Sequence, residues 1–201
     1  MTRSEWKAAA REKLGGGIFK NEWLMGVAYC LIVSVILGAA GSVIPYIGAA
    51  LVTGPMLYAK SYAFLSQARY GGETDVKGLF RGFKEDFGGT FLLGFMSNLF
   101  ICLWSLLLFV PGIMKAYSYS LVYFVRVDHP EYGWRECLAE SQRLMQGHRW
   151  EKFVLDISFI GWGIVGSLCL GVGSLWVMTY MAATEAQYYE YVTGKSAPEH
   201  V

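Results

Sequence analysis

The chain has 201 residues, of which 54% are hydrophobic and only 16% are charged. Soluble domains average about 45–50% apolar and about 25% charged residues, so both departures favour a membrane protein. The net charge of +1 and the absence of a dense basic stripe argue against a nucleic-acid partner.

Three long runs without Asp, Glu, Lys or Arg dominate the sequence, at residues 23–59, 87–114 and 157–184. A helix that crosses a bilayer needs roughly 20 apolar residues, so each run is too long for one span. Each run also contains Pro or Gly turn signals, which predict a helical hairpin. The expected spans are residues 23–44, 47–68, 87–109, 112–127, 153–170 and 173–191. The second span could instead begin as late as Pro55.

The cations lie outside these runs. Five Lys or Arg residues precede the first span, four separate the second span from the third, and five lie between the last turn of the fourth span and the start of the fifth. The tips of the three expected hairpins, near residues 45, 111 and 172, carry none. Because cytoplasmic loops are rich in Lys and Arg, this pattern predicts a multi-pass protein of the cell membrane with both termini in the cytoplasm.

A charged amphipathic segment precedes each expected hairpin, at residues 4–14, 76–87 and 134–148. The clearest is the last, in which Trp134, Leu138 and Leu144 fall on one helical face. This face is expected either to pack on the helix bundle or to lie in the membrane interface, and both alternatives stay open. The fold class is therefore an all-α polytopic membrane bundle of about six transmembrane helices, arranged as three hairpins that each follow a cytoplasmic amphipathic helix. We expect a single domain over 1–201, with repeats at 1–70, 71–130 and 131–194.

Two ionisable residues lie deep in the expected spans. Lys60 lies thirteen residues and Glu185 twelve residues after the start of its expected span, which is about 18–20 Å along a helix. A lone charge in hydrocarbon is costly, so the two are expected to form an ion pair inside the bundle. The alternatives are a pair that supports transport and a purely structural pair.

A second group of polar side chains is a candidate for lining a cavity within the bundle. The alternative is that they are interfacial side chains and interhelical hydrogen-bonding groups. The candidates are Asn98, Lys115, Tyr117, Ser118, Tyr119 and Asp156.

Neither metal-ligand spacing nor a nucleophile–base pair is visible among the Cys, His, Asp and Glu residues. The four cysteines fall in apolar or amphipathic segments, where small apolar packing is their usual role. We therefore expect no metal, no other cofactor and no enzymatic activity.

Several segments together resemble a known family. Residues 103–108 read Leu-Trp-Ser-Leu-Leu-Leu, and residues 111–120 read Pro-Gly-Ile-Met-Lys-Ala-Tyr-Ser-Tyr-Ser. These, with residues 155–162 and 171–176, closely resemble the signature of an uncharacterised bacterial membrane-protein family, domain of unknown function nine-seven-five. The resemblance implies a multi-pass membrane protein without an established activity. A more distant likeness is to the membrane domain of glycerophosphodiester phosphodiesterases, whose catalytic domain this chain lacks.

Two functional hypotheses follow from this reading. The first is a non-enzymatic scaffold or accessory protein at the cytoplasmic membrane, which contacts membrane lipids and either a protein partner or a second copy of the chain. The second is a small-solute transporter or channel, which the repeat and the polar side chains within the spans would serve.

Overall fold

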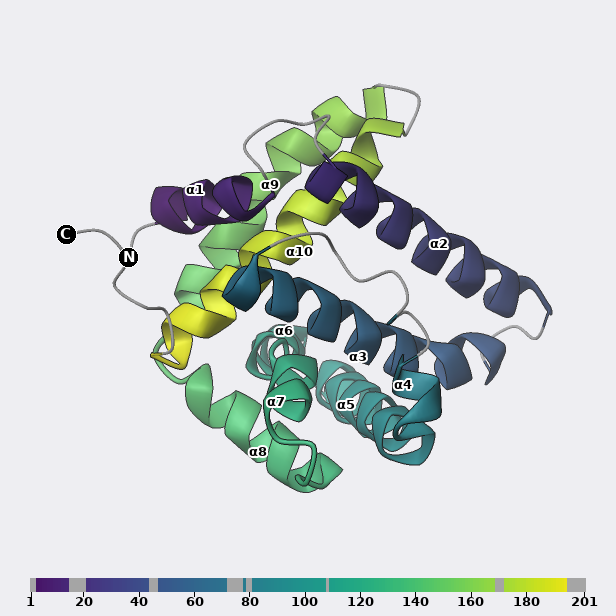
Figure 1. Cartoon of the computed structure of the whole chain (residues 1–201). Coiled ribbons are helices and arrows are strands. Elements are labelled where there is room, and N and C mark those ends of the chain that lie inside the picture. Colours follow the sequence, from purple (N-terminus) through teal and green to yellow (C-terminus); the bar gives the residue numbers. More distant parts are fainter. Residues whose placement is uncertain are drawn as a thin grey trace. The chain divides into compact units, whose positions relative to one another are not determined.

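The computed structural model describes residues 3–14, 21–43, 47–71, 78, 81–107, 109–168 and 172–194 (Figure 1). Over these ranges the chain is mostly helical and has no strand, which confirms the all-α prediction. The helices are α1 (Arg3–Lys13), α2 (Asn21–Val43), α3 (Ile47–Tyr70), α4 (Arg81–Lys84), α5 (Phe87–Leu107), α6 (Phe109–Ser118), α7 (Val122–Asp128), α8 (Trp134–Leu144), α9 (Arg149–Leu168) and α10 (Val172–Val192). The expected hairpin tip at residue 45 and residues 76, 77, 79 and 80 of the amphipathic segment 76–87 lie outside the described residues.

The helix that corresponds to the second expected span begins at the earlier of its two alternative starts. Helix α3 begins at Ile47 and continues through Pro55 to Tyr70. Proline inside a helix removes one backbone hydrogen bond and is usually costly, and this is why the later start was an alternative. The helix nevertheless continues through Pro55, so the stabilisation along the long apolar run exceeds the local cost of the proline.

The prediction of one continuous helix over 112–127 is wrong. Helix α6 ends at Ser118, a turn follows, and α7 begins at Val122. At the break, the carbonyl of Ser118 accepts a hydrogen bond from the hydroxyl of the fully buried Ser141 in α8, at 2.8 Å. The Ser120 hydroxyl donates to the carbonyl of Tyr117 at 2.9 Å. Short hydroxyl side chains compete in this way with helical backbone bonds, so the helix ends.

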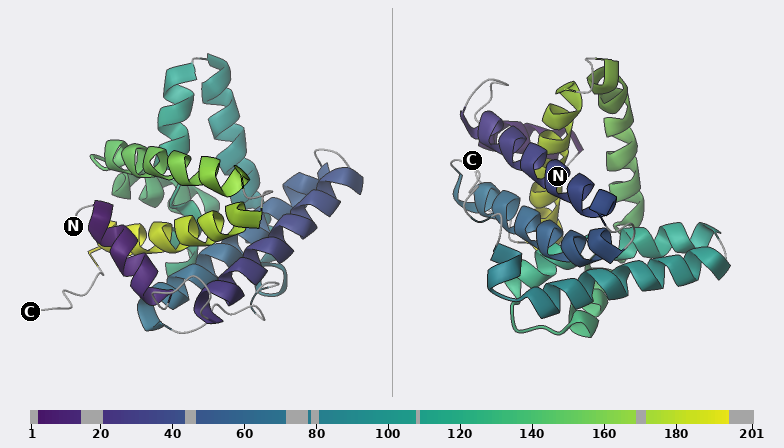
Figure 2. Two further views of the ribbon diagram at one scale, coloured as in Figure 1. Left: turned by 90° about the horizontal axis from the view of Figure 1, so that it is seen from above. Right: turned by 90° about the vertical axis from the view of Figure 1, so that its right-hand side faces the viewer.

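The turn expected at residues 110–112 is shifted, because α6 already begins at Phe109. Pro111 therefore lies in the first helical turn, where a missing amide hydrogen does little harm. A Cβ atom on Gly112 would collide with the Ser105 side chain and backbone. This close approach lets α5 and α6 run side by side as an antiparallel pair (Figure 2).

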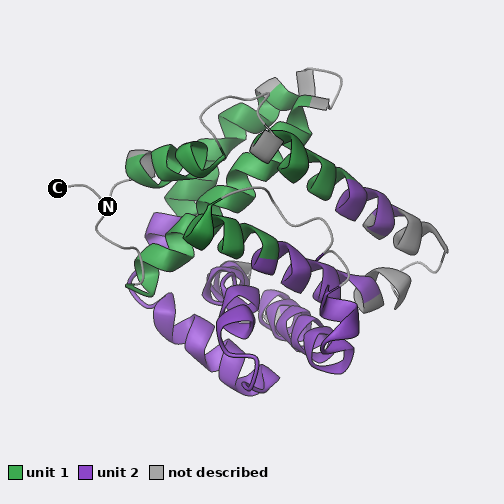
Figure 3. Cartoon of the chain, in the orientation of Figure 1, with its two compact units in different colours: residues 1–31, 63–76, 153–201 green, residues 32–62, 77–152 purple. Residues whose placement is uncertain are grey.

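The chain divides into two compact units (Figure 3). Unit 1 comprises Met1–Leu31, Ala63–Val76 and Phe153–Val201, and unit 2 comprises Ile32–Tyr62 and Lys77–Lys152. In unit 1, the apolar face of α1 packs on α10, and the Trp6 and Tyr188 rings meet edge to face at 5.0 Å. The expectation of one domain with three repeats stays a prediction.

Glycines set the closest helix packing in unit 2. A Cβ atom on Gly94 of α5 would lie 2.9 Å from the Cα atom of Gly54 in α3. A Cβ on Gly54 would collide with the carbonyl of Thr90, which is fully buried. Small residues at such a crossing let two helix backbones approach closely.

Within the described residues, one helix is both long and apolar enough to cross a membrane, judged by length and composition. It is Phe87–Leu106, which is nearly all of α5, and only 22% of its most apolar window is buried inside the protein. A shorter apolar helix covers Trp23–Ile36 in α2.

Candidate functional site

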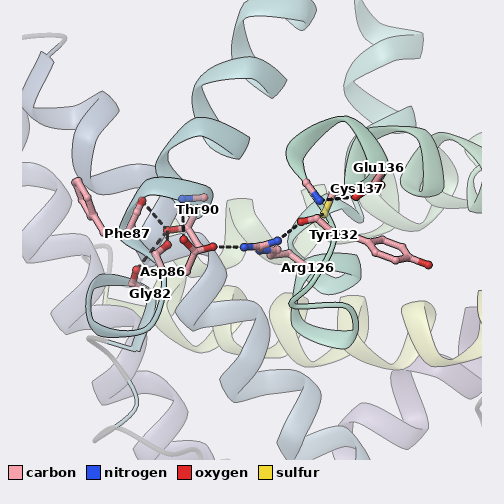
Figure 4. A network of polar contacts seen from close by, with 10 residues as sticks. Gly82, Asp86, Phe87, Thr90, Arg126, Tyr132, Glu136 and Cys137 are labelled. Atoms are coloured by element: carbon pink, nitrogen blue, oxygen red, sulfur yellow. Dashed lines mark hydrogen bonds and ion pairs between the residues drawn. The ribbon is translucent and has the colours of Figure 1, made fainter.

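An arginine at the end of α7 connects three elements of unit 2 (Figure 4). The Arg126 guanidinium pairs with the Asp86 carboxylate, just before α5, and donates to the carbonyl of Tyr132, in the loop before α8. Its side chain is only 12% exposed, and that of Asp86 is 40% exposed. We call Asp86, Arg126 and Tyr132 the arginine clamp.

The sequence before α5 prepares Asp86 for this role. Its second carboxylate oxygen accepts a hydrogen bond from the amide of Gly89 at 2.9 Å, the geometry of a helix N-cap. A Cβ atom on Gly89 would collide with Asp86 and lie 2.8 Å from the Arg126 guanidinium. Glycine at this position thus leaves room for the ion pair against the first turn of α5.

The loop on the other side of Arg126 is held from α8. The Glu136 carboxylate accepts a hydrogen bond from the Gly133 amide at 2.6 Å. The Cys137 thiol lies 3.9 Å from the Tyr132 carbonyl that also accepts from Arg126. Burial raises the pKa of Cys137 to about 11, so this cysteine is a neutral thiol at physiological pH and a poor nucleophile.

A polar cavity of about 460 Å³ adjoins the clamp. Inside it, Arg81 pairs with Glu85 at 2.6 Å and lies 4.0 Å from the centre of the Tyr62 ring. The complete lining is Tyr58, Tyr62, Arg81, Glu85, Asp86, Arg126, Val127 and Pro130. Each arginine has a carboxylate partner, so the cavity is suited to neutral polar groups and has no unpaired cation for an anion.

A second hollow, of about 380 Å³, lies along α8. Its lining is Phe100, Tyr119, Trp134, Arg135, Leu138, Ala139 and Gln142. We call these residues the α8 groove. At its edge, the Lys115 ammonium donates to the Gln142 side-chain oxygen at 2.9 Å. Among the described residues, no cluster of three or more His, Cys, Asp or Glu side chains could hold a metal ion.

The residues of the expected polar cavity are found in different surroundings. Lys115 and Tyr119 meet at the edge of the α8 groove, with 5.5 Å between the ammonium and the ring centre. Asn98 donates to the carbonyl of Gly94 at 2.9 Å, and the Ser118 hydroxyl to that of Met114 at 2.7 Å, both within their own helices.

Tyr117 is half-buried in α6 of unit 2, whereas Asp156 is half-buried in α9 of unit 1. The polar cavity stays a prediction. Lys60 and Glu185 are likewise half-buried and belong to unit 2 and unit 1 respectively, so their ion pair also stays a prediction.

The predicted apolar face of α8 is partly enclosed. Leu138 is buried at 6% exposure, while Trp134 and Leu144 are half-buried. The Trp134 ring stacks on Phe100 of α5, with 6.3 Å between the ring centres. In unit 2 this face therefore meets α5, although its outer part stays accessible.

Two ion pairs between residues far apart in the sequence were not predicted. One is the clamp pair Arg126–Asp86, for which the only local signal is an N-cap aspartate before Phe87. The other is Arg69–Glu190 in unit 1, at 2.7 Å, where the glutamate side chain is 8% exposed. In the sequence both arginines indicate only topology, because their partners lie far away along the chain.

Comparison with known proteins gives one match. Residues 106–196 match the model of a family described as "Protein of unknown function (DUF975)". Searches of curated proteins and of solved structures found no match. The distant likeness to glycerophosphodiester phosphodiesterases receives no support from these comparisons. Residues 106–196 are therefore similar to the uncharacterised family that the sequence signature indicated.

Proposed function

We propose that this chain is a non-enzymatic multi-pass protein of the cytoplasmic membrane that acts as a scaffold or accessory protein. The observation that carries the proposal is the poor burial of α5. A helix of this length and apolarity in the core of a soluble protein would be mostly buried, whereas 22% of its apolar window is buried here. Its exposed side chains suit a hydrocarbon surrounding.

The apolar surface continues beyond α5. On α5, Leu103 is 59% exposed and Leu106 is 86% exposed, and on α6 Val110 is 67% exposed. The opposite end of α5 begins beside the charged arginine clamp. A helix whose N-terminal end is charged and whose C-terminal end is apolar and uncharged is the pattern expected for a membrane hairpin with its charged end in the cytoplasm.

The clamp supports a structural role in preference to chemistry. Its arginine is fully engaged by a carboxylate and a backbone carbonyl, and the neighbouring Cys137 thiol is neutral. A scaffold needs its amphipathic helix, here α8, to be held firmly at the charged end of the α5–α6 hairpin. Arg126 does this by joining the start of α5, α7 and the loop before α8.

The test is cysteine labelling of the full-length chain in intact cells, in a background whose native cysteines are replaced. A membrane-impermeant maleimide should label a cysteine at Val110, at the hairpin tip, and should label one at Gln146 only after permeabilisation. Labelling of Gln146→Cys in intact cells would overturn the proposed orientation. Solute flux into proteoliposomes well above that of protein-free liposomes would favour a transporter over a scaffold.

A further inference from the structure

The α8 groove combines an apolar wall with a cationic rim. Phe100 and Trp134 stack to form one wall, and the buried Leu138 also lines the groove. The Arg135 guanidinium lies 5.0 Å from the centre of the Trp134 ring, on the exposed side of α8. An aromatic wall beside an accessible guanidinium can hold a ligand that is apolar at one end and anionic at the other.

The other end of the groove supplies a second cation. The Lys115 ammonium lies 5.5 Å from the centres of both the Trp104 and Tyr119 rings and donates to Gln142. Lysine carries three donors, so it retains hydrogen-bonding capacity after binding one amide oxygen.

The lining of the groove contains an arginine and no carboxylate. The two acidic side chains of α8 are engaged elsewhere. Glu140 binds Arg143 through two hydrogen bonds of 2.8 and 2.6 Å, and Glu136 accepts from the amide of Gly133. The groove therefore carries local positive charge in a chain whose net charge is only +1.

We propose that the α8 groove binds one anionic phospholipid, with its phosphate at the Arg135 guanidinium and an acyl chain along the exposed apolar side chains of α5, while Lys115 adds positive charge at the other end of the groove. This inference rests on the proposed membrane location and adds a ligand class to it. Charge complementarity selects an anionic headgroup over a zwitterionic one. The exposed Leu103 and the partly exposed Trp104 continue the apolar wall along α5, where an acyl chain would lie.

Native mass spectrometry of the full-length chain, released from detergent with equal amounts of phosphatidylglycerol and phosphatidylcholine, tests the proposal. The wild-type chain should retain one phosphatidylglycerol in preference to phosphatidylcholine. Arg135→Gln should weaken that binding about tenfold, because it removes a charge-assisted hydrogen bond. Arg135→Lys should restore much of it, which separates a charge effect from damage to the fold.

Arg143→Gln is the matched control, since it removes the same charge from the same helix at a side chain that already pairs with Glu140. Its affinity for phosphatidylglycerol should equal that of the wild type. Equal losses in the two variants, or no preference for phosphatidylglycerol, would overturn the proposal. So would displacement of the lipid by millimolar inorganic phosphate, which would indicate a site for a free anion. If labelling confirms the membrane location while lipid selectivity is absent, only this inference fails.

Discussion

Replacement of Arg126 by Met should destabilise unit 2 more than most single substitutions do. Arg126 makes hydrogen bonds to the Asp86 carboxylate and the Tyr132 carbonyl, and its side chain is 12% exposed. Hydrogen bonds to charged groups contribute about 1.5–3 kcal/mol each. Because Asp86 is 40% exposed, water compensates part of its loss, and the expected total is about 2–4 kcal/mol.

The assay is thermal unfolding in detergent, followed by circular dichroism. For a chain of this size, each kcal/mol lowers the melting temperature by about 2–4 °C, so Arg126→Met should lower it by roughly 4–16 °C. Hydrogen exchange should also rise in residues 129–133, because their loop loses its tie to α7. The control is Arg143→Met, because the Arg143 side chain is 68% exposed and pairs with Glu140 on the same helix.

A double-mutant cycle isolates the ion pair within the clamp. Asp86→Asn keeps an oxygen to cap α5 but removes the charge that faces Arg126. The coupling between the two substitutions should be about 1–2 kcal/mol, as expected for residues in direct contact. Additive losses, or an Arg126→Met variant no less stable than Arg143→Met, would refute the clamp.

Three further outcomes are expected. Gly54→Ala should lower the melting temperature by several degrees, because the new Cβ would strike the buried Thr90 carbonyl and force α3 from α5. At pH 8, Cys137 should react with a small maleimide at least about 100-fold more slowly than an ordinary exposed thiol, since a pKa of about 11 leaves little thiolate, and the rate should rise with pH. Lys60→Met and Glu185→Gln should each destabilise the chain, and the double variant should recover much of the loss if the two charges pair.

Each of these outcomes has its own control and contrary result. For Gly54→Ala the control is Gly161→Ala, because a Cβ at Gly161 meets nothing within 4 Å. Gly161→Ala should leave the melting temperature unchanged or raise it slightly. If Gly54→Ala had the same effect as Gly161→Ala, the close packing of α3 on α5 would be contradicted. Gln146→Cys supplies the exposed thiol for comparison, and similar rates at the two cysteines would show that Cys137 is accessible. Strictly additive losses for Lys60 and Glu185 would reject the predicted ion pair.

The positions of the long helices follow from local sequence information. Uncharged runs of sufficient length predicted α2, α3, α5, α9 and α10, because burying apolar side chains sets where such helices lie. The break after Ser118 could not be predicted in this way. The hydroxyl that stabilises it belongs to Ser141, which is 23 residues further along the chain.

The same distinction explains the missed site. Capping of α5 by Asp86 is a local event and visible in sequence, whereas its pairing with Arg126 depends on how α7 returns to the start of α5. The cationic rim of the α8 groove has the same origin. Lys115 reads as a span-end lysine in sequence, and only the fold brings Gln142 of α8 to its ammonium.

The arginine clamp has a consequence for biosynthesis. Asp86 leaves the ribosome 40 residues before Arg126, an interval of about 2–8 s at roughly 5–20 residues per second. During that interval α5 is complete while its capping carboxylate still lacks its cation. The clamp can close only after α6 and α7 have been made, so the start of α5 gains its ion pair only once all three helices have been synthesised.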